Sequence, residues 1–509
     1  MTNLRLILGD QLNLNHSWFQ SVSGDVVYLM AEMRQETQYV KHHAQKVLAI
    51  FAAMRDFANG LTQKGHRVEY VKISHAYSTL TLPKLLEQTA QAIGATAIQI
   101  QEPDEWRLDQ QIKAWSAQTH LTVTWVNSEH FLTTRDEASQ LYASSNQWMM
   151  ERFYRAMRKK HGVLLDEQGR PVGGDWNLDH ENRKAWKGQP AEPRDCRPTH
   201  RHEDLWNEIQ ASGVTTFGEP AETCFRWPLN RSEALSHWQA FVRDALPFFG
   251  DYQDAIDTQH HRLFHSLISF ALNTKMLHPM ELIRDVEAAY HQGSVPLNSA
   301  EGYIRQVLGW REYVRGYYWA HMPKLTQANH FDHHTALPSW FWTGKVNMAC
   351  MQTAINQSLN TAYAHHIQRL MVIGNFSLLA GLDPHALHEW YLGVYIDAFE
   401  WVEAPNTLGM SQSATGNSLA TKPYVSSAAY LHKMGNSCSN CTYKRQERYG
   451  EDACPFNALY WNFFMQHQHL LQSNHRLGMV YRQIERMSED ERTRVKDQAK
   501  VWLLRLEEL

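Results

Sequence analysis

Long hydrophobic runs are missing from this sequence. No apolar stretch reaches the roughly 18 residues that a membrane-spanning helix requires, and the apolar run at the N-terminus stops at Gly9, too early for a signal peptide. An excess of one charge is missing as well, because 49 Lys and Arg residues oppose 53 Asp and Glu residues, for a formal net charge of −4. These absences predict a cytoplasmic protein without a membrane partner, and they exclude a uniformly basic coat for nucleic acid.

Cysteine and the common phosphate-binding motifs are also scarce. Six cysteines in 509 residues are too few for a disulfide framework. The G-x-G-x-x-G and Walker A patterns are absent, which argues against dinucleotide and phosphate loops of those types. The chain is instead rich in Trp (18 residues) and His (29 residues). A buried indole needs a partner for its N–H, so this many Trp residues suggest aromatic sites in addition to core.

Hydrophobic periodicity divides the chain into three parts. Residues 1–135 alternate short apolar strands with helical patterns, which is typical of a parallel sheet covered by helices. Residues 136–235 are polar and proline-rich and predict a crossover between domains. Residues 236–509 are helical throughout, with 261–276 among the expected helices. The expected fold class is a Rossmann-like α/β domain joined to an all-α domain.

Polar side chains follow several of the expected strands. Parallel sheets bind ligands beyond the carboxyl ends of their strands, and Asp10, Gln11, Glu32 and Glu102 occupy such positions. Ordinary polar turns would give the same pattern, so a ligand site and a structural role both stay open here.

A basic helix is expected near the start of the crossover. Its cationic residues alternate with aromatic ones and could follow a phosphate backbone, although a solvated helix face would look alike. The basic residues are Arg152, Arg155, Arg158, Lys159 and Lys160.

The strongest local motif is a set of cysteines near the C-terminus. Cys438 and Cys441 form a C-x-x-C pair, and Cys454 follows on a short loop before a proline. Thiolates at this spacing suit zinc or an iron–sulfur cluster. The fourth ligand must come from elsewhere, and Cys350 lies on an apolar helix where a thiol could otherwise be core.

Two charged residues lie among apolar neighbours in the helical half. Arg311 shares a helix face with Ile304, Val307 and Leu308, so its guanidinium is expected to point inward and to need an anion. Asp397 has equally apolar neighbours and would satisfy it, as part of a ligand site or as a structural ion pair. The adjacent His365 and His366 begin a nearby helix and could be either core or catalytic.

Several blocks together resemble the photolyase/cryptochrome family. Residues 308–313 look like its W-R-E-F block and residues 364–371 like its H-N-R-x-R-M block, while residues 389–397 look like the segment that leads into its flavin pocket. The four cysteines, the crossover segment 173–183 and residues 424–434 resemble one branch, the iron–sulfur bacterial cryptochromes and prokaryotic (6-4) photolyases.

The resemblance implies three bound groups. FAD would lie in the helical domain with Arg311 and Asp397 beside its ring, and Cys350, Cys438, Cys441 and Cys454 would ligate a [4Fe–4S] cluster. An antenna, in this branch 6,7-dimethyl-8-ribityllumazine, would bind the α/β domain near Asp10, Gln11, Glu32 and Glu102. Candidates for the ribityl-phosphate part of FAD are Gln306, Ser266 and Ser269.

Two positions depart from the family pattern. Glu403 stands where ordinary photolyases place an Asn facing flavin N5, and could exchange a proton there if burial raises its pKa. Thr407 stands in place of the proximal Trp of the usual electron relay, so an alternative relay through Trp342, Trp390 and Tyr391 is expected.

The function that the resemblance implies is light-driven repair of (6-4) pyrimidine–pyrimidone lesions in UV-damaged DNA, by a monomer that flips the lesion into a pocket. His366, beside His365, would give the proton, and Tyr424 and Tyr430 would line the pocket. A divalent cation near Asp179, Asp254 and Glu403 is a further hypothesis. The alternatives are a blue-light photoreceptor without repair, a photolyase for cyclobutane dimers, and a zinc-stabilised nucleic-acid-binding protein.

Overall fold

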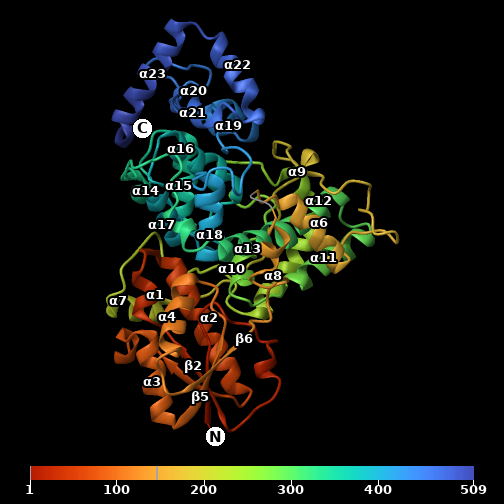
Figure 1. Ribbon diagram of the computed structural model, residues 1–509, viewed down its shortest axis with the longest axis vertical. Helices are drawn as coiled ribbons and strands as arrows, with labels where there is room; N and C mark the ends of the chain where they lie inside the picture. Colours follow the sequence, from red (N-terminus) through yellow and green to blue (C-terminus); the bar gives the residue numbers. More distant parts are fainter. Residues whose placement is uncertain (1, 145–146) are drawn as a thin grey trace.

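The computed structural model describes residues 2–144 and 147–509. The N-terminal part, at the bottom of Figure 1, contains a parallel five-stranded sheet in the order β4-β2-β1-β5-β6. Its strands are β1 (Thr2–Leu6), β2 (Val26–Ala31), β4 (Arg67–Val71), β5 (Ala95–Gln101) and β6 (Thr122–Val126). The strand order reverses between β1 and β5, which is where sheets of this type bind ligands.

Helices cover both faces of this sheet and create two cores. On one face, α3 (Leu82–Ile93) and α4 (Trp106–Ser116) pack on residues such as Leu4 and Ile98. On the other face, α2 (Ala44–Gln63) belongs to a core that continues into the helical half. The boundaries of α3 follow from local sequence, because Pro83 starts the helix and Gly94 ends it at φ +65°.

The crossover contains regular secondary structure and contacts the N-terminal domain. It contains α5 (Glu137–Leu141), α6 (Met150–His161) and α7 (Glu203–Ala211), and it returns to the first domain through β7 (Thr216–Phe217). This short strand pairs in parallel with β3 (His42–His43), directly before α2. The entrance to α2 is therefore tied to a segment more than 170 residues away.

The rest of the chain is helical, and the α19–α23 region forms the end farthest from the sheet, blue in Figure 1. Its elements are α8 (Arg231–Asp244), α9 (Leu246–Tyr252), α10 (Ser269–Asn273), α11 (Pro279–His291), α12 (Leu297–Ile304), α13 (Glu312–His321), α14 (Trp340–Thr343), α15 (Ala349–Thr361), α16 (Asn375–Leu379), α17 (Pro384–Val394), α18 (Glu400–Ala404), α19 (Ala428–Met434), α20 (Pro455–Gln466), α21 (Gln468–Leu471), α22 (Gly478–Arg486) and α23 (Glu489–Leu504). The expected α/β plus all-α fold class is confirmed.

Two features of the helical half differ from the sequence prediction. The expected helix over 261–276 is mostly irregular, and only α10 forms, because Leu263 and Leu267 adopt positive φ. Three π-helical turns interrupt longer helices at η4 (Arg305–Arg311), η6 (Gln368–Gly374) and η7 (Pro405–Ser411). Turns of this kind concentrate at functional sites and change which residues share a face.

A search of residues 2–144 and 147–509 finds no helix that is both long enough and apolar enough to cross a membrane.

Candidate active site

Asp397 pairs with a different arginine from the one that the sequence predicted. It lies in the turn between α17 and α18, and Nη2 of Arg369 donates to its two carboxylate oxygens at 3.0 and 3.2 Å. Ser269 at the start of α10 donates to the same carboxylate at 2.6 Å, and the Arg369 guanidinium carbon lies 3.7 Å from the centre of the Tyr395 ring. Asp397 is 8% exposed, so this is a buried ion pair. Its position is the centre of the candidate site.

Arg311 is buried but lies in another cluster, so the predicted Arg311–Asp397 pair is wrong. Its guanidinium meets His130 at 2.8 Å and Glu312 at 3.3 Å, between the rings of Phe131 and Trp401. Burial lowers the pKa of Arg311 to about 10. Helical spacing predicted that Arg311 points inward, and it does, but spacing does not specify a partner, which the packing of distant segments supplies as His130. Arg369 stood within one of the recognised blocks, where a cation among Leu370 and Met371 was the available signal.

Glu403 is a buried carboxyl group next to this pair. It lies on α18 and accepts a short hydrogen bond from Thr407. Burial raises its pKa to about 7, against the opposing effects of Thr407, Arg369 and Lys46. The condition for proton exchange, a pKa raised by burial, is therefore met.

His366 is exposed to solvent, whereas its neighbour His365 is buried. Desolvation by the surrounding protein and the charge of Arg369 lower the pKa of His366 to about 4. His365 stacks on His265 with ring centres 4.6 Å apart. The lowered pKa of His366 favours its neutral imidazole in the free protein, whereas its role as proton donor needs the protonated form.

Tyr424 and Tyr430 lie on one side of a second polar group, around Asp179 and Asp254. Arg183 and Arg305 pair with Asp179, the latter at 3.1 Å. Burial and the charge of Asp179 raise the pKa of Asp254 to about 6.

The proposed three-carboxylate cation site does not form. Asp179 and Asp254 interact with each other, whereas the charged groups that act on Glu403 are Arg369, Asp397 and Lys46. Within the described ranges, no set of three or more His, Cys, Asp or Glu residues is arranged to hold a metal ion. The spacing in sequence could not show that Glu403 lies in a separate cluster.

The aromatic residues of the expected relay form a connected series through one residue that sequence reasoning missed. Trp342 is 43% exposed, and its ring centre lies 6.3 Å from that of Phe341. The ring centre of Phe341 lies in turn 5.0 Å from that of Trp390. Tyr391 follows at 5.6 Å from Trp390, and its hydroxyl donates to the Arg369 carbonyl at 2.6 Å. The series runs from the surface to the Arg369–Asp397 pair.

The remaining flavin candidates divide into two groups. Ser269 contacts Asp397 directly, as described above. Ser266 accepts from Tyr303 at 3.2 Å, and Gln306 donates to the carbonyl of Gly302 within its own helix. In the described chain, buried Trp401 Nε1 and His365 Nδ1 have no hydrogen-bond partner, which is unusual for buried polar atoms. Trp401 packs against Arg311 and Phe131, and His365 against His265, so these two atoms lie in different surroundings.

The four predicted cysteines gather from three separate segments. Cys350 lies on α15, Cys438 in a short turn (Ser437–Asn440), Cys441 directly after it, and Cys454 at the start of α20. Burial and the proximity of Cys454, Cys438 and Cys441 raise the pKa of Cys350, and burial raises the pKa of Cys454 to about 12. A parallel bridge between Lys444 and Ala453 closes the loop that separates Cys441 from Cys454. The described residues, these cysteines included, contain no group of three or more potential ligands arranged to hold a metal ion.

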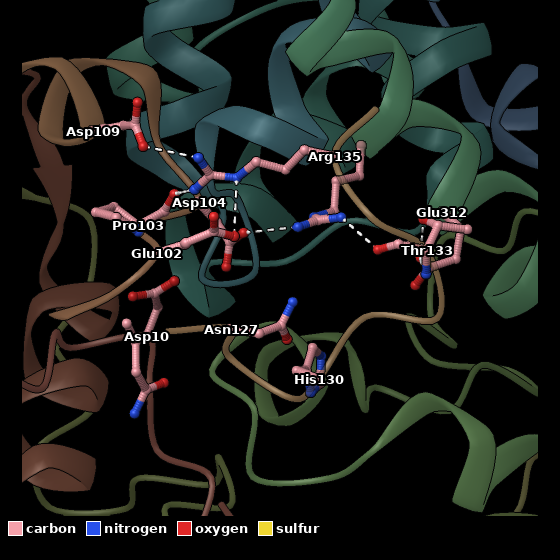
Figure 2. Close-up of polar contacts among 12 residues, drawn as sticks. Asp10, Glu102, Pro103, Asp104, Asp109, Asn127, His130, Thr133, Arg135 and Glu312 are labelled. Atoms are coloured by element: carbon pink, nitrogen blue, oxygen red, sulfur yellow. Dashed lines mark hydrogen bonds and ion pairs between the residues drawn. The ribbon is translucent and has the colours of Figure 1, made fainter. Parts of the chain in front are cut away.

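The expected antenna residues separate into two clusters. Asp10 and Asp104, which follow β1 and β5, both contact the buried Lys275, at 2.8 and 3.0 Å. Figure 2 shows Asp10, Glu102 and Asp104 on the same side of the strand ends. Gln11 lies beside them, donating to the Gln101 carbonyl at 3.3 Å.

Glu32 belongs elsewhere. Its buried carboxylate accepts hydrogen bonds from Arg55, Tyr70 and the backbone of Ile73, all between 2.7 and 2.9 Å. Both carboxylate oxygens of Glu32 therefore have hydrogen-bond partners within the protein, as in a structural ion pair.

The basic helix α6 presents four of its five cations to solvent. Arg152, Arg155, Lys159 and Lys160 are exposed. Arg158 is 1% exposed and donates to the carbonyls of Val163, Leu164 and Trp176, so its expected contact with DNA is wrong. The signal was present in the sequence, because position 158 shares a helix face with buried Tyr154 and Met157.

Comparison with known proteins identifies the family. A family model described as deoxyribodipyrimidine photo-lyase-related protein matches residues 5–225. A (6-4) photolyase of Agrobacterium fabrum is 40% identical over 516 aligned residues, which cover 100% of both chains. An uncharacterised protein of Acanthamoeba polyphaga mimivirus is 35% identical over 66 residues, covering 13% of this chain and 54% of that protein. A crystal structure of a bacterial class III photolyase from Agrobacterium tumefaciens matches with a TM-score of 0.57 at 16% identity, over 83% of this chain and 81% of that one, and supports the fold alone. Since the similarity to the Agrobacterium (6-4) photolyase extends over both full lengths, the chain belongs to the photolyase family.

Proposed function

We propose that this protein repairs (6-4) pyrimidine–pyrimidone photoproducts in DNA with light, using FAD held in the helical domain. The observation that carries the proposal is the convergence of His366, Arg369, Asp397 and Glu403 in a relative that is similar over its full length to a (6-4) photolyase. Reduced FAD, when bound, supplies the electron that light drives into the lesion.

The residues of the chain would orient the bound ligand and the lesion and would exchange protons with them. Arg369 and Asp397 present a donor and an acceptor to one edge of a planar ligand, and their buried ion pair holds both in place. Glu403 holds or releases a proton close to neutral pH. Tyr424 and Tyr430 would contact a flipped-out lesion, whose extraction costs less than that of a paired base.

His366 would deliver the proton to the lesion. The free side chain is neutral, but the phosphates of bound DNA add negative charge, which favours the imidazolium form and raises its pKa again. Proton delivery by His366 therefore depends on DNA binding, and this requirement helps to restrict its acid form to the complex.

Two further bound groups are part of the proposal. Cys350, Cys438, Cys441 and Cys454 would hold a [4Fe–4S] cluster, and the effect of the other three cysteines on the pKa of Cys350 supports their proximity. An antenna chromophore such as 6,7-dimethyl-8-ribityllumazine would bind near Asp10, at the point where the strand order reverses.

The test is illumination of the purified holoprotein with an oligonucleotide that contains one (6-4) lesion. Loss of the lesion absorbance under blue light supports repair. His366→Ala should abolish the turnover, whereas His334→Ala, which alters an exposed histidine paired with Asp332, should not. A flavin-containing protein that leaves the lesion intact would indicate the photoreceptor alternative, and repair of cyclobutane dimers alone would contradict the proposed substrate.

A further inference from the structure

One buried cation of the helical core comes from the other domain. Lys46 lies in the first turn of α2, in the N-terminal α/β domain, and is 3% exposed. Its ammonium group donates to the carbonyl of Leu392 at 2.6 Å and to the carbonyl of Ala398 at 2.5 Å. A buried ammonium needs such partners, because its desolvation is costly.

The two acceptors lie on either side of the turn that carries Asp397. Leu392 is in the last turn of α17, where carbonyl groups have no partner within the helix, and a cation there also interacts favourably with the helix dipole. Ala398 directly follows Asp397, and the ring of Phe399 lies 5.7 Å from the Lys46 nitrogen. One side chain thus ties the end of α17 to the start of α18.

The start of α2 is held firmly enough to give Lys46 a defined position. Gln45 donates to the carbonyls of Glu219 and Asn360, at 2.9 and 2.8 Å. His43 lies 2.7 Å from the carbonyl of Leu359. The ammonium therefore enters the helical domain from a docked helix end.

Lys46 also contributes charge to the site. It attracts Asp397, Glu403 and Glu105, and it repels Arg369. The imidazoles of His42 and His43 lie on its own side of the interface. Tyr391 and Tyr395 face Glu403 from α17 and the turn that follows. Burial lowers the pKa of Lys46 to about 8, so the charged ammonium form is still favoured at pH 7.

We propose that Lys46 is a positioning residue of the flavin site: it holds the Asp397 turn in place and supplies, from the antenna domain, a positive charge that favours the ionised form of Glu403. This inference rests on the proposed function, and it adds a residue that no motif singled out, since Lys46 stands between ordinary helix residues. A change in the docking of the two domains would then alter the proton content of the site.

The experiment separates the charge of Lys46 from its hydrogen bonds. Lys46→Gln keeps two amide donors for the two carbonyls and removes the charge, whereas Lys46→Met removes both. The readout is an infrared titration of the Glu403 carboxyl band in the dark holoprotein, with Glu403→Gln to assign the band. Loss of the ammonium makes the carboxylate less favourable, so both variants should raise the titration midpoint by roughly one pH unit.

Lys41→Met is the matched control, because it removes the same charge five residues away from an exposed position. Its midpoint should equal that of the wild type. An unshifted midpoint in Lys46→Gln would overturn the proposal and leave Lys46 a helix-end contact. If neither variant folds, Lys46→Arg keeps the charge and must keep the midpoint; a shift of about one unit there would equally refute it.

The titration needs neither light nor a lesion. Its result is therefore distinguishable from failure of the proposed function, which would appear as wild-type protein without flavin or without repair.

Discussion

The buried ion pair between Arg369 and Asp397 makes a prediction that separates the structure from the sequence expectation. Arg369→Met leaves the carboxylate of Asp397, 8% exposed, with Ser269 and without its cation. Hydrogen bonds to charged groups contribute about 1.5–3 kcal/mol, and breaking a buried pair costs about 3–5 kcal/mol. If FAD binding loses only the smaller of these two amounts, the FAD dissociation constant rises roughly 10- to 100-fold.

The assay is a double-mutant cycle on the FAD dissociation constant, measured by the recovery of flavin fluorescence. Asp397→Asn should lose affinity alone, and the Arg369→Met/Asp397→Asn double variant should lose clearly less than the sum, with a coupling of about 1–3 kcal/mol. The comparison cycle uses Arg311→Met, another buried arginine, which contacts His130 and Glu312 and reaches Asp397 only through Asn273, a donor to the Asp397 backbone carbonyl; its coupling to Asp397→Asn should therefore be much smaller than that of Arg369. Coupling of Asp397 to Arg311 with none to Arg369 would refute the assignment.

Three further predictions concern other parts of the molecule. Arg158→Met should destabilise the fold by about 2–4 kcal/mol, because three carbonyls lose their donor, and it should not change the salt dependence of DNA binding. Lys159→Met should leave the stability unchanged and should lower, by about one, the slope of the logarithm of DNA affinity against the logarithm of salt concentration. Burial lowers the pKa values of His333 and His467, whose Nε2 atoms lie 3.3 Å apart, to about 4. Since each folded-state pKa lies below the unfolded value of about 6.5, the unfolded chain binds more protons between pH 6.5 and 4. The free energy of unfolding therefore decreases as the pH is lowered through this window, by up to about 3 kcal/mol per histidine. His333→Phe should make the thermal midpoint depend less on pH, and an unchanged pH dependence would contradict this. Cys350→Ser should lose iron and the brown absorbance while FAD stays bound, and full iron content in this variant would remove Cys350 from the ligand set.

Local pattern was enough to predict the architecture. Alternation of strands and helices over residues 1–135 predicted the parallel sheet, because side-chain periodicity and turn residues act within a few positions. The same holds for α3, whose Pro83 and Gly94 mark its ends, and for the C-x-x-C pair of Cys438 and Cys441. The family motifs extended the prediction to Asp397, His366 and Glu403.

The errors came from geometry that no local pattern encodes. Arg311 was placed beside Asp397 because both have apolar neighbours and because the family blocks suggested the pair, whereas the fold brings its guanidinium to His130. Glu403 and Asp179 are both acidic and both near recognised motifs, yet they belong to clusters with different partners. The helical face of Arg158 could be predicted from Tyr154 one turn earlier, and Arg369 stood within a recognised block, so these two errors were avoidable.

The sequence by itself determined which segments form strands and helices, which family the motifs resemble, and which cysteines could ligate a cluster. Only the tertiary structure decided that Arg369 is the partner of Asp397, and that Lys46 crosses from one domain to reach Leu392 and Ala398. The physical reason is range: helix and strand formation depends on neighbours within a few residues, while a buried charge is satisfied by whichever group the packing of distant segments brings within about 3 Å.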